Sequence, residues 1–257
     1  MSKEHGVSNV PLMDSYLERL GIGAAPTPSW PALCDLVTRH LYTVPFENLD
    51  IIDQLPSELS TAAVLHKVAI RRRGGFCYEL NEAFRALLTH LGFEVKRIES
   101  RVWSEARGEY GPPFDHLALV VSLPEGDYLT DVGYGDNNRT PLRFPADGLY
   151  DLSGAYRLQP TFDLWLLWRS GRPLYKMTFT EQPLSAFAAM YRHHRTSPDS
   201  IFTQGLICTR ATRTGRTTLS RDRLIIVDGA QRSEIVITDR DQALQQYFGI
   251  NKENGAC

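Results

Sequence analysis

The sequence predicts an α+β protein with three consecutive parts: helices first, an antiparallel sheet second, and a small mixed segment last. Apolar residues recur every three or four positions in the first third, which is the spacing of one face of a helix. Short segments rich in β-branched and aromatic residues replace that pattern from Phe93 onward. Both patterns occur near the end of the chain. We therefore expect domains at residues 1–92, 93–200 and 201–257.

Four helices are expected before residue 92. They lie in SYLERLGI, SWPALCDLVTRHLYTV and STAAVLHKVAIRR, and in residues 77–91. Ser60 or Thr61 can cap the third, because a hydroxyl accepts a hydrogen bond from a free N–H of the first turn. The fourth helix is the clearest, since its apolar residues recur at three- and four-residue intervals and Gly92 follows as a stop signal.

The middle third is expected to form an antiparallel sheet, either open or closed into a barrel. Its strands are FEVKRIESRVW, HLALVVSL, DYLTDVGYG, AYRLQ, LWLLWR and LYKMTF. The sequence PEGD marks a hairpin turn between the second and third of these strands. A helix in AFAAMYRHHRTSPDSIF should end before Pro198.

The last segment mixes strands with one helix. GLICTRAT, GRTTLSRDRLIIV and SEIVITD each have the composition of a strand. DRDQALQQYFGI is expected to be a closing helix, with Thr238 and Asp241 spaced as in a capping box.

Composition and charge favour small-molecule partners. The 257 residues carry a formal net charge of −2, so the long-range field that attracts nucleic acid or an acidic membrane is missing. The chain has no apolar run of roughly 18 residues that could span a bilayer, and its start lacks the pattern of a secretory signal. A cytoplasmic protein is expected. The widely spaced Cys34, Cys77, Cys208 and Cys257 suggest free thiols, not disulfides or a metal knuckle.

Cys77 lies in an unusual context, RRRGGFCYELNEAF at residues 71–84. It falls at or beside the first turn of its helix, where free N–H groups and the helix dipole favour an anion and are expected to lower the thiol pKa. Gly74 and Gly75 permit a sharp turn that brings main-chain donors close. A nucleophile fits this setting, and so does a buried cysteine that only fills space. The position of Cys77 in the sequence does not decide between these two interpretations.

A nucleophilic thiol needs a base, and the base needs an orienting group. Of the seven histidines, His116 differs because it opens an apolar strand, whereas most of the others are expected on the surface. A hairpin with an even number of loop residues places His116 and Asp131 on one face, offset by two or four residues. The alternative for Asp131 is a carboxylate that caps a turn. Cys77, His116 and Asp131 match zinc spacing poorly, so a catalytic triad is the better interpretation and no metal is expected.

The chain resembles the arylamine N-acetyltransferases. Four motifs carry the resemblance in order: VPFENL at 44–49, RGGFCYELN at 73–81, PFDH at 113–116 and DVGYG at 131–135. The resemblance runs from about residue 10 to the ending FGI at 248–250. It implies a helical N-terminal domain, a β-barrel domain and an α/β C-terminal lid around a catalytic core like that of papain and the transglutaminases. It also implies acetyl transfer from acetyl-coenzyme A to an arylamine or arylhydrazine through an acetyl-cysteine.

The resemblance also implies roles for particular residues. Cys77 would be the nucleophile, His116 the base that holds the thiol as an ion pair, and Asp131 the residue that fixes the imidazole. Phe46, Val102 and Tyr134 would line the aryl pocket, although core packing explains these residues as well. Gly133 would let the pantetheine of the coenzyme approach the main chain. No tightly bound cofactor is implied, because acetyl-coenzyme A is a co-substrate.

Two charged sites are interpreted from their surroundings. Glu47 and Arg73 lie inside apolar motifs and are expected to pair with each other. The triplet at residues 71–73 either contacts coenzyme phosphates or is a solvated helix end with one internal pair, and the second is favoured. Pro112 and Pro113 replace the Thr-Gly of some family members, so coenzyme contacts are not transferred to them.

Three functions remain open on the sequence. The first is the acetyltransferase. The second is a related Cys-His-Asp amide synthase or cysteine hydrolase that uses another acyl donor. The third is a binding protein that keeps the scaffold without catalysis, in which case Cys77 would be no more reactive than Cys34 or Cys208.

Overall fold

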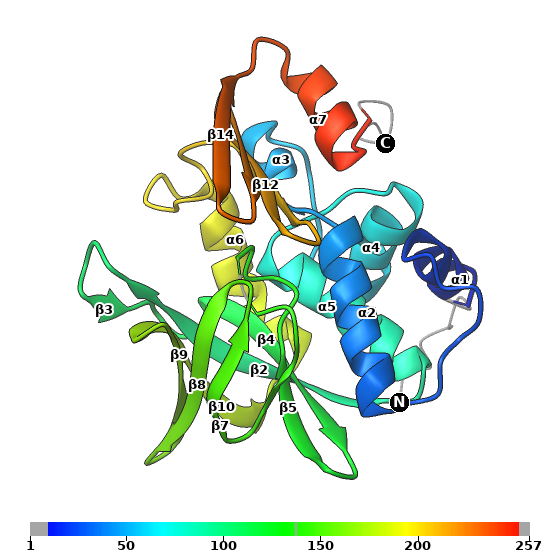
Figure 1. Cartoon of the computed structure of the whole chain (residues 1–257), viewed down its shortest axis with the longest axis vertical. Helices are drawn as coiled ribbons and strands as arrows, with labels where there is room; N and C mark the ends of the chain where they lie inside the picture. Colours follow the sequence, from blue (N-terminus) through cyan, green and yellow to red (C-terminus); the bar gives the residue numbers. More distant parts are fainter. Residues whose placement is uncertain (1–9, 137, 252–257) are drawn as a thin grey trace.

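The computed structural model describes residues 10–136 and 138–251, and it shows helices, an antiparallel barrel and a smaller sheet in that order along the chain (Figure 1). Most of the N-terminal helices lie on one side of the molecule, the barrel lies below and beside them, and the smaller sheet and the last helix lie at the opposite end from the barrel. The α+β class predicted from the sequence is confirmed.

The N-terminal helices follow the apolar pattern of the sequence closely. They are α1 (Val10–Arg19), α2 (Trp30–Thr43), α3 (Leu49–Ile52), α4 (Thr61–Leu65), a π-helix (His66–Ile70) and α5 (Cys77–His90). Ser60 caps α4 by accepting a hydrogen bond from Ala63 N, as one of the two expected choices. The expected helix at 77–91 is α5, whose apolar face is buried in the largest hydrophobic core.

The barrel is built from one nearly closed antiparallel sheet. Its strands are β2 (Glu94–Ser104), β4 (His116–Leu123), β5 (Gly126–Thr130), β6 (Leu142–Arg143), β7 (Ala146–Asp151), β8 (Gly154–Thr161), β9 (Leu164–Arg169) and β10 (Arg172–Glu181). Their order is β6-β5-β4-β2-β10-β9-β8-β7, and the short β3 (Glu109–Tyr110) pairs with β2. The two end strands, β6 and β7, contact each other and bring the sheet close to closure.

The C-terminal sheet includes a piece of the N-terminal region. Its order is β1 (Phe46–Glu47), β11 (Ile207–Ala211), β12 (Gly215–Ser220), β13 (Arg223–Asp228) and β14 (Gln231–Val236). A 3-10 turn (Leu184–Phe187) and α6 (Ala188–Thr196) lead into this sheet, and α7 (Arg240–Phe248) follows it. Phe187 and Tyr191 belong to the same core as α5, so chain from beyond residue 93 completes the helical core. The boundaries at residues 92 and 200 stay a prediction.

Two local predictions are wrong. The single strand expected at 215–227 is a hairpin of β12 and β13, because Arg221 takes a left-handed φ of 54° and the chain reverses between Ser220 and Arg223. The cap of α7 is Asp239, which accepts a hydrogen bond from Gln242 N at 2.9 Å, and not Thr238. The N-cap of the helix is therefore one residue later in the sequence than the capping-box spacing predicted.

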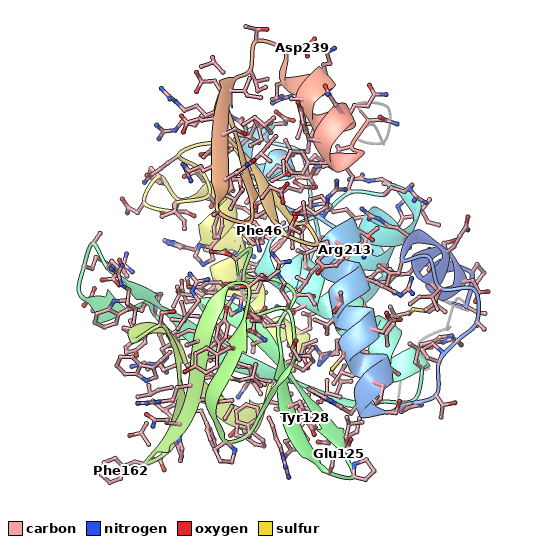
Figure 2. The ribbon with its side chains drawn as sticks, viewed as in Figure 1. Phe46, Glu125, Tyr128, Phe162, Arg213 and Asp239 are labelled. Atoms are coloured by element: carbon pink, nitrogen blue, oxygen red, sulfur yellow. The ribbon has the colours of Figure 1, made fainter. Side chains whose placement is uncertain are left out.

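The β4–β5 hairpin directs the candidate residues toward the middle of the molecule. Leu123 pairs with Gly126, so the loop contains two residues, as the sequence PEGD indicated. Figure 2 shows Glu125 at the outer tip of this hairpin and Phe46 near the centre of the molecule. His116 begins β4 and Asp131 directly follows β5, so both lie at the end of the hairpin away from its tip.

Candidate active site

Cys77 is the first residue of α5 and lies on a tightly packed turn. A side-chain carbon added to Gly74 would lie 1.9 Å from Pro45 O, so only glycine lets the chain pass β1 here. The carboxylate of Glu79 accepts a hydrogen bond from Phe76 N at 3.2 Å and satisfies one free donor of the first turn. The Cys77 side chain is almost completely buried, with 3% of the residue exposed.

His116 and Asp131 lie on the same face of the hairpin, as predicted from an even number of loop residues, and their side chains are in contact. Leu119 pairs with Thr130, which places Asp131 two residues from His116 on the same face of the sheet. His116 Nε2 lies 2.8 Å from Asp131 Oδ2. The His116 side chain also acts on Cys77, because its charge and hydrogen-bonding group act to lower the pKa of the thiol. Because Nε2 is bound to Asp131, Nδ1 is the ring nitrogen left for the sulfur.

Two residues that the sequence analysis missed also bind Asp131. Asn81 Nδ2 donates to Oδ1 at 2.9 Å, and the hydroxyl of Tyr175 donates to Oδ2 at 3.0 Å. The N–H of Gly133 also donates to Oδ1, at 2.9 Å. Asn81 could have been found from the sequence, because it lies one helical turn after Cys77 on the same face. Tyr175 could not, because its position depends on how β10 pairs with β2.

The electrostatics of this pair favour an imidazolium at His116. Burial alone would lower the pKa of His116, but the nearby carboxylate of Asp131 outweighs burial and raises it to about 10. Burial alone would raise the pKa of Asp131, and here the charge and hydrogen bond of His116 prevail and lower it. His116 is therefore cationic and Asp131 anionic at neutral pH.

The expected direction of the Cys77 pKa is wrong. Burial raises the pKa of the thiol above 9.0, although the hydrogen bond and charge of His116 and the N–H of Leu117 act in the opposite direction. The sequence indicated a helix N-terminus but not the depth at which the sulfur lies. The thiolate consequently depends on the adjacent imidazolium for its stabilisation.

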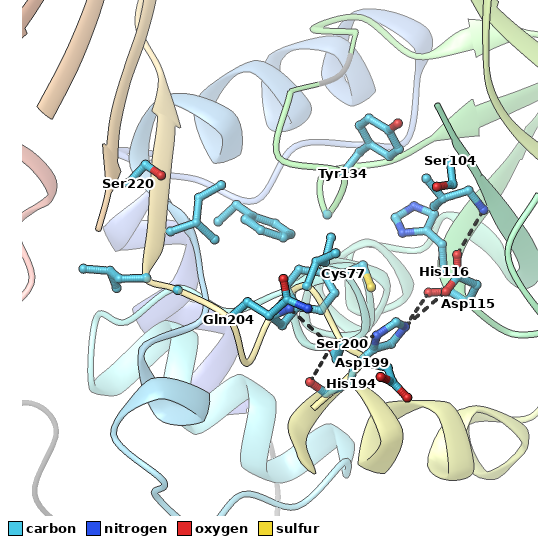
Figure 3. A pocket seen from close by; sticks show the side chains of 18 of the residues that line it. Cys77, Ser104, Asp115, His116, Tyr134, His194, Asp199, Ser200, Gln204 and Ser220 are labelled. Atoms are coloured by element: carbon cyan, nitrogen blue, oxygen red, sulfur yellow. Dashed lines mark hydrogen bonds and ion pairs between the residues drawn. The ribbon is translucent and has the colours of Figure 1, made fainter. Parts of the chain in front are cut away.

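A cavity of about 890 Å³ opens beside Cys77 (Figure 3). Phe46, Val102, Gly133 and Tyr134, the residues expected to contact substrates, all line it together with Cys77 and His116. Its other walls come from the end of β2 and the segment that leads to β4, from α6 and the loop that follows it, and from the C-terminal sheet. The cavity therefore lies where the three parts of the chain meet and is large enough for a substrate that reaches Cys77.

Gly133 lies against α5. A side-chain carbon there would lie 2.8 Å from Cys77 Cα, 2.9 Å from Cys77 O and 2.6 Å from Asn81 Nδ2. The missing side chain therefore lets the end of the β5 segment approach α5. This close approach explains the glycine without a ligand.

A buried group of five charged residues, here called the ionic cluster, lies beside the same helix turn. It consists of Glu47, Asp50, Lys67, Arg73 and Glu79. The predicted pair is confirmed, with Arg73 Nη2 2.9 Å from Glu47 Oε1, and Arg73 also lies 2.9 Å from Asp50 Oδ1. Lys67 Nζ lies 2.7 Å from Asp50 Oδ2 and 3.0 Å from Glu79 Oε1. Of the basic triplet, Arg72 is exposed and Arg73 is buried.

Two histidines in helices that were expected to be surface positions are buried. His40 bonds to the hydroxyl of Tyr16, with 2.7 Å between Nδ1 and the oxygen, inside the helical core. His194 lines the cavity and lies 3.3 Å from Asp115 Oδ1. Helical spacing did not reveal either, because the neighbouring polar residues on α2 and α6 masked the buried face.

The remaining expectations concern thiols, metals and membranes. Cys34, Cys77 and Cys208 are free thiols, and Cys257 and His5 lie outside the described residues. Within residues 10–136 and 138–251, no three or more His, Cys, Asp or Glu side chains are grouped so that they could hold a metal ion. Over the same ranges, no helix has both the length and the apolar character needed to cross a bilayer.

Comparisons with known proteins agree with this geometry. The sequence matches the N-acetyltransferase family over residues 29–256. It is 33% identical to an arylamine N-acetyltransferase of Mycobacterium tuberculosis over 252 residues, covering 93% of this chain and 89% of the relative. Identity with the Mycolicibacterium smegmatis enzyme is 34% over 253 residues, covering 93% and 92%.

Solved structures of the family have the same fold. The M. tuberculosis arylamine N-acetyltransferase superposes with a TM-score of 0.87 at 32% identity, covering 95% of this chain and 96% of that one. The Mycobacterium marinum enzyme in complex with CoA superposes with a TM-score of 0.85 at 30% identity, covering 95% of each chain. Taken with the geometry of Cys77, His116 and Asp131, these matches show that the chain belongs to the arylamine N-acetyltransferase family and is an acetyltransferase.

Proposed function

We propose that the protein moves an acetyl group from acetyl-coenzyme A to the nitrogen of an arylamine or arylhydrazine in two steps through an acetyl-cysteine at Cys77. The observation that carries the proposal is that Cys77 and His116 line the same cavity and act on each other's pKa, while His116 Nε2 lies 2.8 Å from Asp131 Oδ2. A nucleophile, a base and an orienting carboxylate in contact are what acyl transfer through a covalent intermediate requires.

In the first step the Cys77 thiolate attacks the thioester carbonyl. The C–S bond to coenzyme A breaks, a new C–S bond to Cys77 forms, and the coenzyme thiolate leaves with the proton of the His116 imidazolium. One thioester replaces another, so the step is nearly balanced in free energy. The N–H of Cys77 lies in the first turn of α5, where N–H groups have no acceptor within the helix, and it is proposed to stabilise the oxyanion.

In the second step the amine nitrogen attacks the acetyl-cysteine. Neutral His116 accepts the proton that the nitrogen loses, and the Cys77 thiolate leaves beside the restored imidazolium. Asp131 stays ionised and keeps Nε2 of His116 engaged, so Nδ1 faces the reacting atoms. The apolar sides of Phe46, Val102 and Tyr134 are proposed to bind the aryl ring and to keep water from the thioester.

Gly133 and the wider cavity are proposed to receive the acyl donor. The relative from M. marinum has been solved with CoA, which supports a CoA thioester as donor for this chain. Because the thiol at position 77 must stay reduced to react, the cytoplasm is the proposed location. No nucleic acid or membrane partner is needed for these steps.

Mass spectrometry of the intact protein tests the proposal. Incubation with acetyl-coenzyme A alone should add one acetyl group, peptide mapping should place it on Cys77, and later addition of an arylamine should remove it. Cys77→Ala should gain no acetyl group, and Cys34→Ala is the matched control that should still gain one. A cysteine hydrolase would instead be labelled by a peptide ester, and a binding protein by neither compound. Either result would contradict the proposal.

A further inference from the structure

The smaller sheet ends in an open edge at β14. The order of that sheet is β1-β11-β12-β13-β14, and Figure 1 shows β14 on its outer side. In the part of the chain that the structure describes, no strand pairs with the outer edge of β14. All six of its residues are exposed, among them Ile235 at 45% and Val236 at 62%. Such an edge presents unpaired main-chain groups that can bind another strand.

Alternate residues of β14 direct their main-chain groups outward. Asp228 pairs with Gln231 across a two-residue turn, so Gln231 and every second residue after it bond to β13. The N–H of Ile237 donates to Asp222 O at 2.7 Å, in agreement with this alternation. The groups that point away from the sheet belong to the other three residues of the strand, Arg232, Glu234 and Val236.

The charges on this edge are complementary to a second copy of the same strand. Residues that oppose each other in an antiparallel pair lie on the same face of the sheet, so the two-fold axis must pass through a residue and not between two. With the axis on Ser233, Arg232 of each copy lies opposite Glu234 of the other. With the axis on Arg232 or on Glu234, like charges would oppose each other, which destabilises a strand pair. Charge therefore selects the axis on Ser233.

The main-chain hydrogen bonds agree with the same register. Arg232 and Glu234 both direct their N–H and C=O groups outward and would face each other, so each such pair can form two hydrogen bonds. Ser233, whose main-chain groups bond to β13, would lie on the axis, where the two strands form a pair without hydrogen bonds. Side-chain charge and main-chain pattern thus favour one arrangement.

The two charged side chains of this edge are accessible, and one of them belongs to the cavity wall. Glu234 Oε1 lies 2.5 Å from Arg223 Nη1, and Oε2 lies 3.7 Å from Arg232 Nη2. The Arg232 side chain is 61% exposed. Glu234 and Arg223 both line the cavity that contains Cys77. A second copy bound at β14 would therefore bring its Arg232 to the rim of this cavity.

We infer that two copies of this chain associate by antiparallel pairing of β14 about Ser233, which joins their smaller sheets into one. The inference does not depend on the proposed role of Cys77. A contact made mainly by one strand of each copy buries a small area, so the association is weak, with an expected dissociation constant on the order of 100 μM.

Sedimentation velocity of the full chain at low salt, from about 10 to 500 μM, tests the association. The average mass should rise with concentration from 29.0 kDa, the mass of one chain, toward twice that value. Arg232→Glu places like charges opposite each other and should weaken association about tenfold. Adding Glu234→Arg to that variant restores opposite charges and should restore association. Arg172→Glu, at an exposed position in the barrel, is the matched control for the change of charge.

A cysteine on the axis provides a second measurement. In a pair without hydrogen bonds the Cα atoms lie about 4.5 Å apart, which a disulfide can span. Ser233→Cys should therefore join two chains through position 233 under mild oxidation, and peptide mapping identifies the bond. Ile235→Cys, on the same face of the strand, would lie opposite Gln231 of the second copy and should form no such bond.

Four results would overturn the inference. They are a wild-type mass that stays at one chain over the whole range, equal association in Arg232→Glu and the wild type, no recovery in the double variant, or a disulfide that forms as fast at position 235 as at 233. The disulfide measurement gives its answer even if the charge variants fail to fold. A failure of the proposed function would appear separately, as the absence of acetyl labelling from acetyl-coenzyme A.

Discussion

The first turn of α5 lies between two buried charged networks that differ in one respect. In the ionic cluster, each of the five charged groups contacts at least one group of opposite sign within the protein. The network of Cys77, His116 and Asp131 ends at the wall of a cavity instead. The first network holds its charges fixed, whereas the second is proposed to exchange a proton with a substrate. The same helix turn is thus supported by ion pairs on one side and borders the cavity on the other.

The pKa directions express the same difference. Burial alone would lower the pKa of Lys67, but the carboxylates of Glu79, Glu47 and Asp50 outweigh it and raise that pKa well above its ordinary value. Lys67 therefore stays charged at neutral pH. The pKa of His116 is raised to about 10, by Asp131 first and by Cys77 second, and this lower value is compatible with a change of protonation during a reaction.

Removing a cation from the ionic cluster should have the largest effect. Arg73→Met leaves Glu47 and Asp50 buried without one of their partners, and we expect a loss of about 3–5 kcal/mol in the free energy of unfolding. Urea denaturation followed by circular dichroism measures this loss. Arg72→Met, at the exposed neighbouring residue, should change the free energy by less than about 0.5 kcal/mol. Similar values for the two variants would show that the cluster does not support the helix turn.

Asp131→Asn should have the second-largest effect, and the effect should be mainly on the rate of acetyl transfer. The amide cannot stabilise the His116 imidazolium, so kcat/KM for acetyl transfer should fall by about 100-fold or more. Steady-state kinetics with an arylamine measures the fall. Glu125→Gln, at the tip of the same hairpin, should retain wild-type kinetics. Activity in Asp131→Asn within a few-fold of wild type would remove Asp131 from the proposed triad.

The same substitution should change how stability depends on pH. The folded pKa of His116, about 10, lies above its unfolded value of 6.5, so the folded state binds one more proton between these values. The stabilisation is fully present below pH 6.5 and is lost as the pH rises through 10. The free energy of unfolding should therefore fall by about 1.4 kcal/mol per pH unit inside this window. Urea titrations from pH 7 to 9 should show this slope in the wild type and a shallower one in Asp131→Asn.

Gly133→Ala should have a smaller effect, on stability and activity together. The added carbon would come within 3 Å of Cys77 Cα and Asn81 Nδ2, so the β5 segment must move away from α5. We expect a loss of about 1–3 kcal/mol in the free energy of unfolding. Gly23→Ala, where the added carbon meets nothing within 4 Å, is the matched control in thermal unfolding. An unperturbed Gly133→Ala would show that the close approach is not required.

Tyr175→Phe should have the smallest effect of the series. It removes the hydrogen bond from Tyr175 to the Asp131 carboxylate and keeps the ring that contacts His116. A loss of about 1 kcal/mol of stabilisation corresponds to roughly a fivefold fall in kcat/KM. Tyr128→Phe, in β5 of the same barrel, controls for loss of a hydroxyl. A fall as large as that of Asp131→Asn would mean that Tyr175 does more than position the carboxylate.

The parts of the site that the sequence could predict depend on local rules. Helical spacing located α5, and strand parity placed His116 and Asp131 on one face, because both rules need only neighbouring residues. The pairing of Glu47 with Arg73 followed from two charges in apolar motifs. These predictions did not require the order of the strands in the sheet.

The parts that could not be predicted depend on contacts between distant segments. Tyr175 reaches Asp131 through the pairing of β10 with β2, and His194 reaches Asp115 because α6 packs against the start of α5. The pKa of Cys77 depends on how deeply the folded chain buries the sulfur. The turn at Arg221 and Asp222 contains neither glycine nor asparagine, the usual signals of a tight turn. One long strand was therefore predicted where the structure has two short ones.

The two-residue strand β1 ties the far end of the chain to the reaction centre. Phe46 pairs with Thr209 on one side, forms a bridge with Gly75 on the other, and lines the cavity. A shortened protein that stopped near residue 200 would therefore retain Cys77, His116 and Asp131. It would lose β11, the strand that holds Phe46 at the wall of the cavity. A smaller catalyst made from this chain must therefore contain a replacement for β11, the strand that pairs with β1.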